Sequence, residues 1–167
     1  MISKEARDAL NSPMPQSWVK HREGGGGKAL SFAEGWQIID EMNQIFGPGA
    51  WGYDTAPILV VDEERDGSKG KRWHVTYNCK CVLTVYGPSR ESVTIGDWGT
   101  GHGIDKDRGV AHESAIKEAC TDSTKRAAKS LGRRLGLALY DKEQRHVEQE
   151  PQPVSREAAG LIEMLTT

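Results

Sequence analysis

A run of basic side chains is the strongest candidate for chemistry in this sequence of 167 residues. Between Lys125 and Arg134 there are five basic residues and no acidic one. Lys125, Lys129 and Arg133 are spaced four apart, and Arg126 lies three before Lys129, so in a helix they project from one side. A helix that packs through its other side and presents only cations is suited to binding phosphates. The alternative is a solvated helix face, although such faces usually mix charges of both signs.

The overall charge does not by itself predict a nucleic-acid partner. The chain carries 22 basic and 24 acidic residues, a net charge of −2, and its pI is near 6.2. Two groups of acidic residues lie at 62–66 and 141–150, apart from the basic run. A protein that is acidic overall can present a local positive field when its charges are separated in this way. Composition alone therefore leaves nucleic-acid binding open.

Two glycine-rich stretches invite comparison with phosphate-binding loops. The sequence GGGGK fails the P-loop pattern, because that pattern needs glycine where this chain has Arg22 and Ser or Thr where it has Ala29. It also follows no predicted strand. Residues 99–103 read GTGHG, which is a weak signal without supporting context. The sequence argues against an NTPase and predicts two loops, over 19–29 and 99–109.

Side chains that bind metals occur close together in one segment. Asp97, His102, Asp105 and Asp107 lie within eleven residues and offer oxygen and nitrogen ligands. They match neither the EF-hand nor the HExxH spacing, so we expect a polar loop. A magnesium-dependent nuclease that uses the three aspartates is one alternative. No serine or cysteine stands in a nucleophile motif, and the sequence predicts no catalytic residue, no metal and no cofactor.

The elements that position these residues follow from the hydrophobic pattern. Ser31 and Glu34 form a capping box ahead of one long apolar helical pattern, and a second such pattern contains the basic run. A run of strands flanked by helices predicts an α+β fold with an antiparallel sheet rather than alternating α/β. The predicted helices cover 3–10, 31–46 and about 110–139, and the predicted strands cover 50–62, 73–86 and 90–98.

The chain is long enough for one domain and a tail. We expect a folded domain over 1–141, a charged linker with two prolines over 142–154 and a short amphipathic helix over 155–167. No apolar run approaches the roughly 20 residues of a membrane span, and the charged N-terminus does not resemble a signal peptide. Three cysteines without a CxxC pair fit a reducing compartment, as small buried side chains. The sequence predicts a cytoplasmic protein with no membrane contact.

Three sequence blocks stand in order along the chain: REGGGGKALSFAEGW at 22–36, NQIFGPGAWGYD at 43–54 and AIKEACTDSTKRAAKSLGRRLGLALYD at 115–141. Together they resemble the Rad52/Rad22 family of double-strand-break repair proteins. Their order and spacing also agree with that family, and the resemblance extends over about residues 17–141. Three blocks in the same order form a more specific pattern than any single motif in this chain.

The resemblance implies a curved antiparallel sheet of three to four strands that packs on the long helix. It also implies assembly into a ring or filament, with single-stranded DNA in a positive groove around it. Phe32 stands at an aromatic position of the family, and we expect it to pack rather than to stack on a base. Carried over by position, the inner DNA-binding residues are Arg22, Lys125, Arg126 and Lys129, with Arg133 continuing the same stripe, and a second, shallower DNA site consists of Arg72, Lys106 and Arg108.

The function implied by the resemblance is annealing. Such a protein binds single-stranded DNA, with double-stranded DNA as a second ligand, and pairs complementary strands in homologous recombination and repair without ATP and without being an enzyme. A single-strand-binding protein or a recombinase would be its protein partner. Because the long C-terminal region of eukaryotic members is missing here, the chain looks like a bacterial or phage-type member that acts at the nucleoid. The alternatives are a passive single-strand-binding module, the metal-dependent nuclease, and an interaction module with an acidic protein partner.

Overall fold

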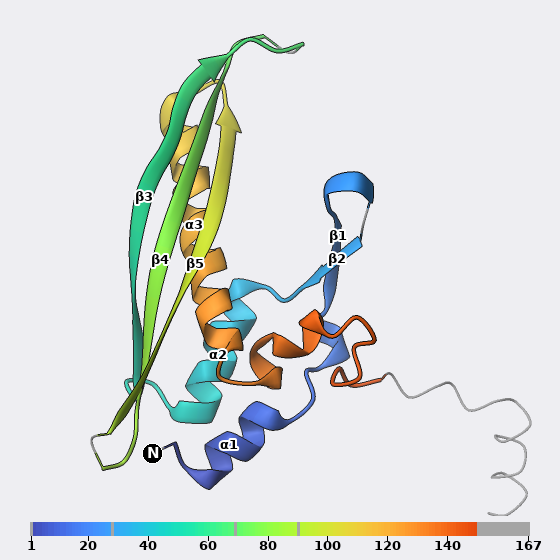
Figure 1. The fold of residues 1–167 in the computed structure, drawn as a ribbon, viewed down its shortest axis with the longest axis vertical. Coiled ribbons are helices and arrows are strands. Elements are labelled where there is room, and N and C mark those ends of the chain that lie inside the picture. Colours follow the sequence, from blue (N-terminus) through green and yellow to red (C-terminus); the bar gives the residue numbers. More distant parts are fainter. Residues whose placement is uncertain (1, 28, 69, 90, 150–167) are drawn as a thin grey trace, which may run out of the picture.

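The computed structural model describes residues 2–27, 29–68, 70–89 and 91–149 (Figure 1). The predicted tail helix over 155–167 and the last part of the predicted linker lie outside the described residues. Within the described part, no helix is long and apolar enough to cross a membrane.

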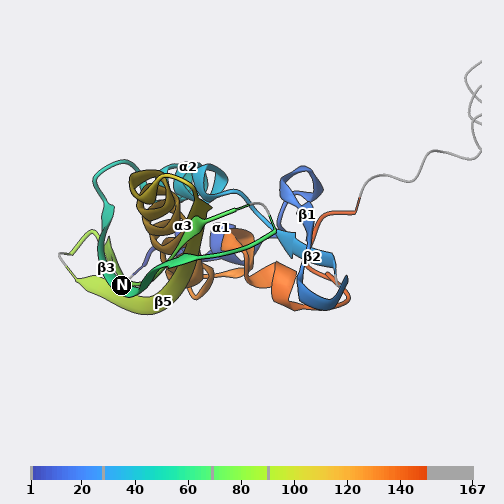
Figure 2. The ribbon, with the colours of Figure 1, turned by 90° about the horizontal axis from the view of Figure 1, so that it is seen from above.

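A three-stranded antiparallel sheet forms the longest part of the molecule. Its strands are β3 (Trp51–Arg65), β4 (Arg72–Tyr86) and β5 (Ser92–Asp105), in the order β3-β4-β5. The helix α3 (Arg108–Lys129) runs along one face of the sheet, mainly over β4 and β5 (Figures 1 and 2). The predicted α+β fold, a sheet packed on a long helix, is confirmed. Side chains at odd positions of β4 face α3 and are buried, among them Val75, Cys79, Cys81, Leu83 and Val85.

The predicted glycine loop over 99–109 is wrong, because three of its four glycines belong to β5 and the fourth, Gly109, lies in α3. Gly99, Gly101 and Gly103 alternate along this strand and lie directly under α3. A Cβ added at Gly101 would lie 2.1 Å from the carbonyl oxygen of Ala115, and one at Gly103 would lie 1.8 Å from that of Ala111. The facing side of α3 is equally small, with fully buried alanines at four-residue spacing. The GTGHG sequence therefore allows a helix and a strand to approach closely.

The long helix ends ten residues earlier than predicted. After Lys129 the chain forms two short 3-10 helices, Arg133–Leu135 and Leu137–Tyr140. Two glycines explain the break. A Cβ at Gly132 would lie 2.4 Å from the backbone oxygen of Leu10, and Gly136 has a φ of 109°, which favours glycine. Leu131, Leu135 and Leu139, which have helical spacing and fall within the predicted helix, lie instead in this turn region.

Two further helices flank the lower end of the sheet. The predicted helix 3–10 is confirmed as α1 (Lys4–Asn11), and Ser3 Oγ accepts a hydrogen bond of 3.1 Å from Ala6 N. The helix α2 (Gly35–Phe46) begins four residues later than predicted. Its capping box is formed by Glu34 and Gln37. Gln37 Oε1 accepts a hydrogen bond of 2.9 Å from Glu34 N. The Ser31–Glu34 box predicted from the sequence is therefore wrong.

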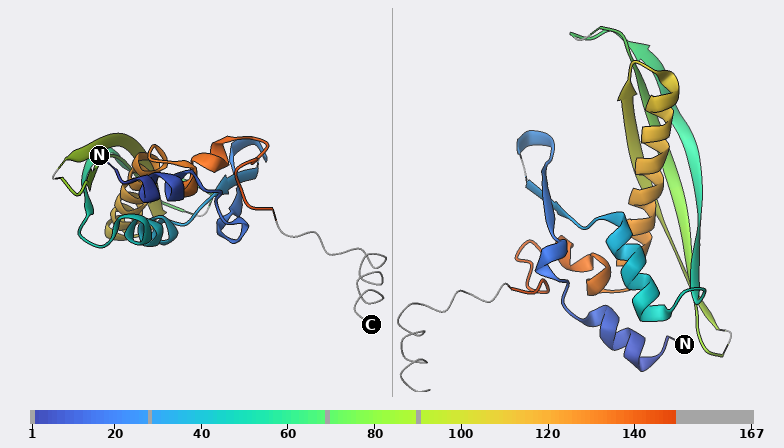
Figure 3. Two further views of the ribbon diagram at one scale, coloured as in Figure 1. Left: turned by 90° about the horizontal axis from the view of Figure 1, so that it is seen from below. Right: turned by 180° about the vertical axis from the view of Figure 1, so that it is seen from behind.

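Residues predicted as the first glycine loop form a β-hairpin. Its strands are β1 (Lys20–Glu23) and β2 (Ala29–Phe32), and Arg22 pairs with Leu30 across them. Gly26 and Gly27 in the tight connection have φ values of 76° and 73°, where glycine is favoured. The hairpin projects away from the three-stranded sheet, on the side of α2 (Figures 1 and 3). A further 3-10 helix, Gln16–Trp18, precedes it.

The main core lies where these elements meet the lower end of the sheet. The described part of the predicted linker reaches this core, because Val147 is buried and pairs with Met14. Met14 N donates to His146 O at 2.9 Å, and Glu148 N donates to Met14 O at 2.8 Å. The largest buried side chains of this core are Met14, Ile38, Met42, Leu83, Leu135 and Val85.

Both edges of the sheet carry features that oppose further strand pairing. Along β5, backbone N–H groups donate to side-chain carboxylates: Trp98 N to Asp97 (2.7 Å), Thr100 N to Asp122 (3.3 Å) and His102 N to Glu118 (2.7 Å). Along β3, the edge contains Pro57, and the register with β4 shifts between Leu59 and Val61. Proline and bulges are common at natural edge strands.

Candidate nucleic-acid interface

The β1–β2 hairpin brings one predicted cation next to another that is more than a hundred residues away in sequence. The guanidinium carbon of Arg22 and Lys125 Nζ each lie 5.7 Å from the centre of the Phe32 ring. Lys125 Nζ also lies 3.4 Å from the backbone oxygen of Ala33, to which it donates. Both positive charges thus lie at cation–π distance from the same half-buried Phe32 ring.

Lys129 continues this positive surface one turn further along α3. Its Nζ lies 4.0 Å from the centre of the Tyr140 ring, which is itself exposed. Arg133 is also exposed, but it stands in a 3-10 helix beyond the end of α3. The prediction that Lys125, Lys129 and Arg133 share one helix face therefore holds only for the two lysines.

Arg126 faces a different neighbour from Lys125. Its Nε lies 3.5 Å from Oδ1 of Asp97 on β5, without a hydrogen bond of good geometry. About two fifths of the side chain is exposed. Arg126 thus has a carboxylate beside it that Lys125 lacks, and the structure does not bring it into contact with Phe32.

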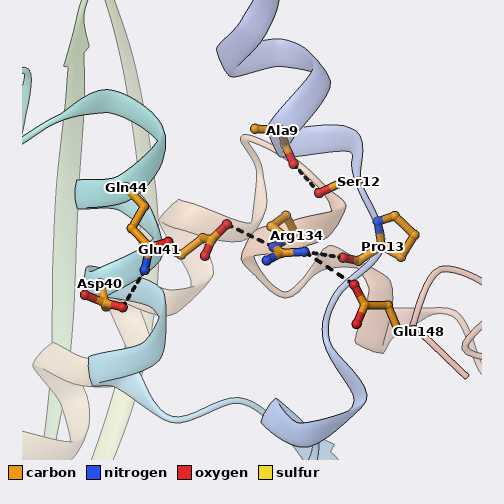
Figure 4. A network of polar contacts seen from close by, with 8 residues as sticks. All are labelled: Ala9, Ser12, Pro13, Asp40, Glu41, Gln44, Arg134 and Glu148. Atoms are coloured by element: carbon orange, nitrogen blue, oxygen red, sulfur yellow. Dashed lines mark hydrogen bonds and ion pairs between the residues drawn. The ribbon is translucent and has the colours of Figure 1, made fainter. Parts of the chain in front are cut away.

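Arg134, the last residue of the basic run, is a structural residue (Figure 4). Its Nε donates to Oε1 of Glu41 on α2 at 2.9 Å, and one terminal nitrogen donates to Pro13 O at 2.9 Å. The same nitrogen lies 3.7 Å from a carboxylate oxygen of Glu148, and the guanidinium stacks over Trp18 at 5.3 Å. Arg134 joins the N-terminal segment, α2 and the end of the described chain.

Ion pairing divides the basic residues into two groups. Within the part of the chain that the structure describes, Arg22, Lys125, Lys129 and Arg133 form no ion pair with a carboxylate. Eight other basic side chains have acidic partners, and these are Lys4, Arg65, Lys71, Arg108, Lys117, Arg126, Arg134 and Arg145. The lack of an acidic partner does not by itself single out the predicted site, because it is shared within the described part by Arg7, Lys20, Arg72, Lys80, Lys106 and Lys142. Uncompensated charge is what produces a positive potential at a surface.

The residues predicted for a second site lie at the other end of α3. Arg108 begins the helix, about 25 Å along its axis from Lys125 at 1.5 Å per residue. It pairs with Asp62 on β3 and stacks over Trp73 at 4.8 Å. The hydrogen bond from Arg108 holds the pKa of Asp62 below its ordinary value.

Arg72 and Lys106 flank the same end of the sheet, because the register pairs Trp73 with Asp105. Lys106 is exposed, and Arg72 is half-buried with an Nε that has no hydrogen-bond partner among the described residues. Arg72 also lines a hollow of about 210 Å³ near the β3–β4 turn. The structure thus gathers the three predicted residues at one end, with Arg108 already engaged by a carboxylate.

The aspartates of the nuclease alternative have separate structural partners. Asp97 lies beside Arg126, Asp107 caps α3 by accepting from Val110 N at 3.0 Å, and Asp105 accepts from Asp107 N at 2.9 Å. Among the described residues, no three His, Cys, Asp or Glu side chains gather in a way that could hold a metal ion.

The three cysteines are free thiols near the middle of α3 and β4. Cys79 and Cys81 are buried, and Cys79 Sγ lies 3.5 Å from Cys120 Sγ. Burial raises the pKa of the Cys81 and Cys120 thiols. At neutral pH, Cys81 and Cys120 therefore react more slowly than unperturbed thiols.

The sequence of the folded part matches one known family. The sequence model described as Rad52/22 family double-strand break repair protein matches residues 3–157. The chain belongs to this family. Its Rad52/22 match includes the hairpin, the sheet, α3 and the turn region after it.

Curated relatives are fungal Rad52/22 proteins. The chain is 32% identical over 140 residues to the DNA repair and recombination protein RAD52 of Eremothecium gossypii, covering 80% of this chain and 29% of the relative. It is 30% identical over 143 residues to the DNA repair and recombination protein rad22 of Schizosaccharomyces pombe, covering 81% of this chain and 28% of the relative. It is 28% identical over 146 residues to RAD52 of Saccharomyces cerevisiae, covering 84% of this chain and 29% of the relative. The chain spans under a third of the length of these relatives, and their fungal origin gives no support to the predicted bacterial or phage type.

Several features of this Rad52/22 surface could not be predicted from local sequence patterns. The hairpin that carries Arg22 to Phe32 was missed because four glycines read locally as a loop. The contact of Lys129 with Tyr140 depends on the turn region after α3, which no local sequence pattern predicts. Trp36 and Tyr53, two exposed aromatic residues near Lys125, were also missed. Large exposed aromatic side chains in a charged surface are a signal that could have found them.

Proposed function

We propose that this protein binds single-stranded DNA through Arg22, Lys125 and Lys129, with Arg126 and Arg133 beside them, and anneals complementary strands without ATP. The observation that carries the proposal is that Arg22 and Lys125 lie at the same Phe32 ring and that, among the described residues, neither forms an ion pair with a carboxylate. Cations without carboxylate partners can exchange their hydration for phosphates, which bind without regard to base sequence. Membership in a family of double-strand break repair proteins supports the same reading.

The annealing step follows from the kind of contact. A protein that holds phosphates leaves base edges available for a second strand, and the free energy of base pairing then drives the reaction. No nucleotide hydrolysis is needed, and the protein acts as a binding surface rather than an enzyme. Arg72, Lys106 and Arg108 are proposed as a second, weaker DNA site, in which Arg108 must share its charge with Asp62.

We also propose that copies of the chain assemble into a ring or filament. Ile58, Leu59 and Val60 form three consecutive apolar residues on β3, each about half exposed. Exposed apolar side chains close together on an edge strand support a contact between copies. Light scattering of the purified protein, with and without DNA, measures the assembly directly.

The test is strand annealing by the purified protein in the absence of ATP and metal. Complementary labelled oligonucleotides are mixed with wild type, with Lys125→Ala, and with Lys117→Ala as the matched control. Lys117 is an exposed lysine on the same helix, paired with Glu113. We expect wild type and Lys117→Ala to accelerate pairing.

Lys125→Ala should bind several-fold more weakly to all sequences, and its slope of log affinity against log salt should fall by about 0.7, the loss of one phosphate contact on a single strand. Equal affinity of Lys125→Ala and wild type would contradict the assigned site. Binding of wild type without accelerated pairing would identify a passive single-strand-binding module.

A further inference from the structure

A cleft of about 380 Å³ opens beside Lys125, between α2, β3 and α3. Its rim carries Trp36 from the first turn of α2 and Tyr53 from β3, whose side chains are 65% and 46% exposed. Lys125 lines the same cleft and also contacts Phe32 on its other side. The cleft is therefore continuous with the cations that we propose to hold DNA.

Both aromatic side chains are held in place although they are exposed. Trp36 Nε1 donates to Oε2 of Glu34 at 3.1 Å, and Glu34 is itself fixed as the N-cap of α2. The Tyr53 ring stacks on Trp51 with centroids 5.9 Å apart and an angle of 15° between the planes. Trp51 in turn donates through Nε1 to Asn43 Oδ1 at 3.0 Å. Fixed aromatic faces bind a flat ring with a smaller loss of side-chain entropy than mobile ones.

The inner wall of the cleft is narrow and partly polar. Gly35 approaches α3 so closely that a Cβ there would lie 2.8 Å from a methyl carbon of Thr121. Thr55 and Thr121 are polar residues among the lining, beside Ile38 and Ile39 of α2. Aromatic faces, a few hydroxyls and one cation at the entrance suit a flat heterocycle attached to an anionic chain.

We propose that this cleft takes up one unpaired nucleobase of the single strand whose phosphates lie on Lys125. The inference rests on the proposed DNA-binding function and adds a contact to the base, which phosphate contacts alone do not make. A base within a duplex is stacked and paired, and it can enter only after it is unpaired and unstacked. The cleft thereby favours single strands over double strands, and it releases the base when a complementary strand arrives.

The test compares a strand that has bases with one that lacks them. Fluorescence anisotropy measures binding of labelled oligothymidylate and of an abasic strand of equal length, at one salt concentration. Trp36→Ala should weaken binding of oligothymidylate by about 5-fold or more, the effect of losing one stacked base, and leave the abasic strand unchanged. Lys125→Ala should weaken both strands equally. Trp98→Ala, which removes an exposed tryptophan from β5, is the matched control and should not distinguish the strands.

A second readout uses the cysteine in the cleft. Cys120 lines it, whereas Cys79 and Cys81 are buried. Oligothymidylate should slow alkylation of Cys120 by a maleimide, and the abasic strand should not.

The outcomes separate this inference from the proposed function. If wild type binds neither strand, the DNA-binding function itself fails. If wild type binds DNA and Trp36→Ala leaves both affinities unchanged, the nucleobase site is wrong while the phosphate site stands. If Trp36→Ala weakens both strands equally and lowers the assembly size in light scattering, the cleft is filled by a neighbouring copy and the inference is overturned.

Discussion

Gly101 gives the sharpest test of how α3 is held on the sheet. A Cβ at this position would lie 2.1 Å from Ala115 O and 2.3 Å from Ala119 N, both backbone atoms of α3. Ordinary contacts of a Cβ begin near 3.4 Å, so Gly101→Ala requires the helix to move outward by about 1.3 Å. Neither atom belongs to a flexible side chain that could turn aside.

The expected cost follows from that displacement. Moving α3 opens gaps along its whole contact with β4 and β5, and overpacking of one methyl group typically destabilises a protein by about 1–3 kcal/mol. Because backbone atoms must move here, we expect at least about 3 kcal/mol, measured as a lower midpoint of urea unfolding at constant slope. Lys125 and Lys129 are carried on α3, so DNA affinity should fall as well.

Gly96→Ala on the same strand is the control. The nearest atom to a Cβ at Gly96 is Cys81 O at 3.5 Å, an ordinary contact. Replacing glycine by alanine there should be neutral or should stabilise the protein by about 0.4–1 kcal/mol, because alanine lowers the conformational entropy of the unfolded chain. If Gly101→Ala proved as stable as Gly96→Ala, the close approach of helix and strand would be refuted.

Two other substitutions test the polar contacts. Arg134→Met should lower the free energy of unfolding by about 1–3 kcal/mol, because it leaves the carboxylate of Glu41, which is 6% exposed, without its donor. Lys117→Met, which breaks an exposed pair, should cost less than about 0.5 kcal/mol, and similar unfolding midpoints for the two variants would contradict the role of Arg134. Asp62→Asn should reduce the acid sensitivity of the fold. The hydrogen bond from Arg108 lowers the folded-state pKa of Asp62, so its contribution is complete above about pH 5 and is lost as the pH falls below about 4. The urea midpoint is measured at pH 7 and at pH 3. If it falls by the same amount in Asp62→Asn and in wild type, the Arg108–Asp62 pair does not contribute to the acid sensitivity.

Local patterns predicted the type of most elements but not all of their limits. The strands alternate apolar and polar residues, and α2 has a helical apolar face, so both are visible in sequence. Ser31–Glu34 and Glu34–Gln37 both fit the spacing of a capping box, and only the pairing of β2 with β1 decides between them. Glycine is rare in strands, so GTGHG read as a loop. Its place in β5 is explained only by the alanine face of α3, which is a tertiary contact.

In the candidate site, the sequence likewise could not show which basic side chains have acidic partners. Sequence identified which side chains are cationic, but Lys125 and Arg134 belong to one basic run and look equivalent there. The difference lies in their neighbours: Glu41 is 93 residues from Arg134, and Asp62 is 46 residues from Arg108. A pattern within one segment contains no information about such partners. The family resemblance supplied Arg22, which no local charge run would have connected to α3.

The capped edge of β5 bears on the assembly that we propose. Copies of the chain gathered along one DNA strand would reach a high local concentration, which favours pairing between open sheet edges. Here Asp122 and Glu118 accept from two of the outward N–H groups of β5, and Pro57 interrupts the opposite edge. These features disfavour strand pairing between copies, so the proposed assembly would form through side-chain contacts, which separate more readily than a continuous sheet.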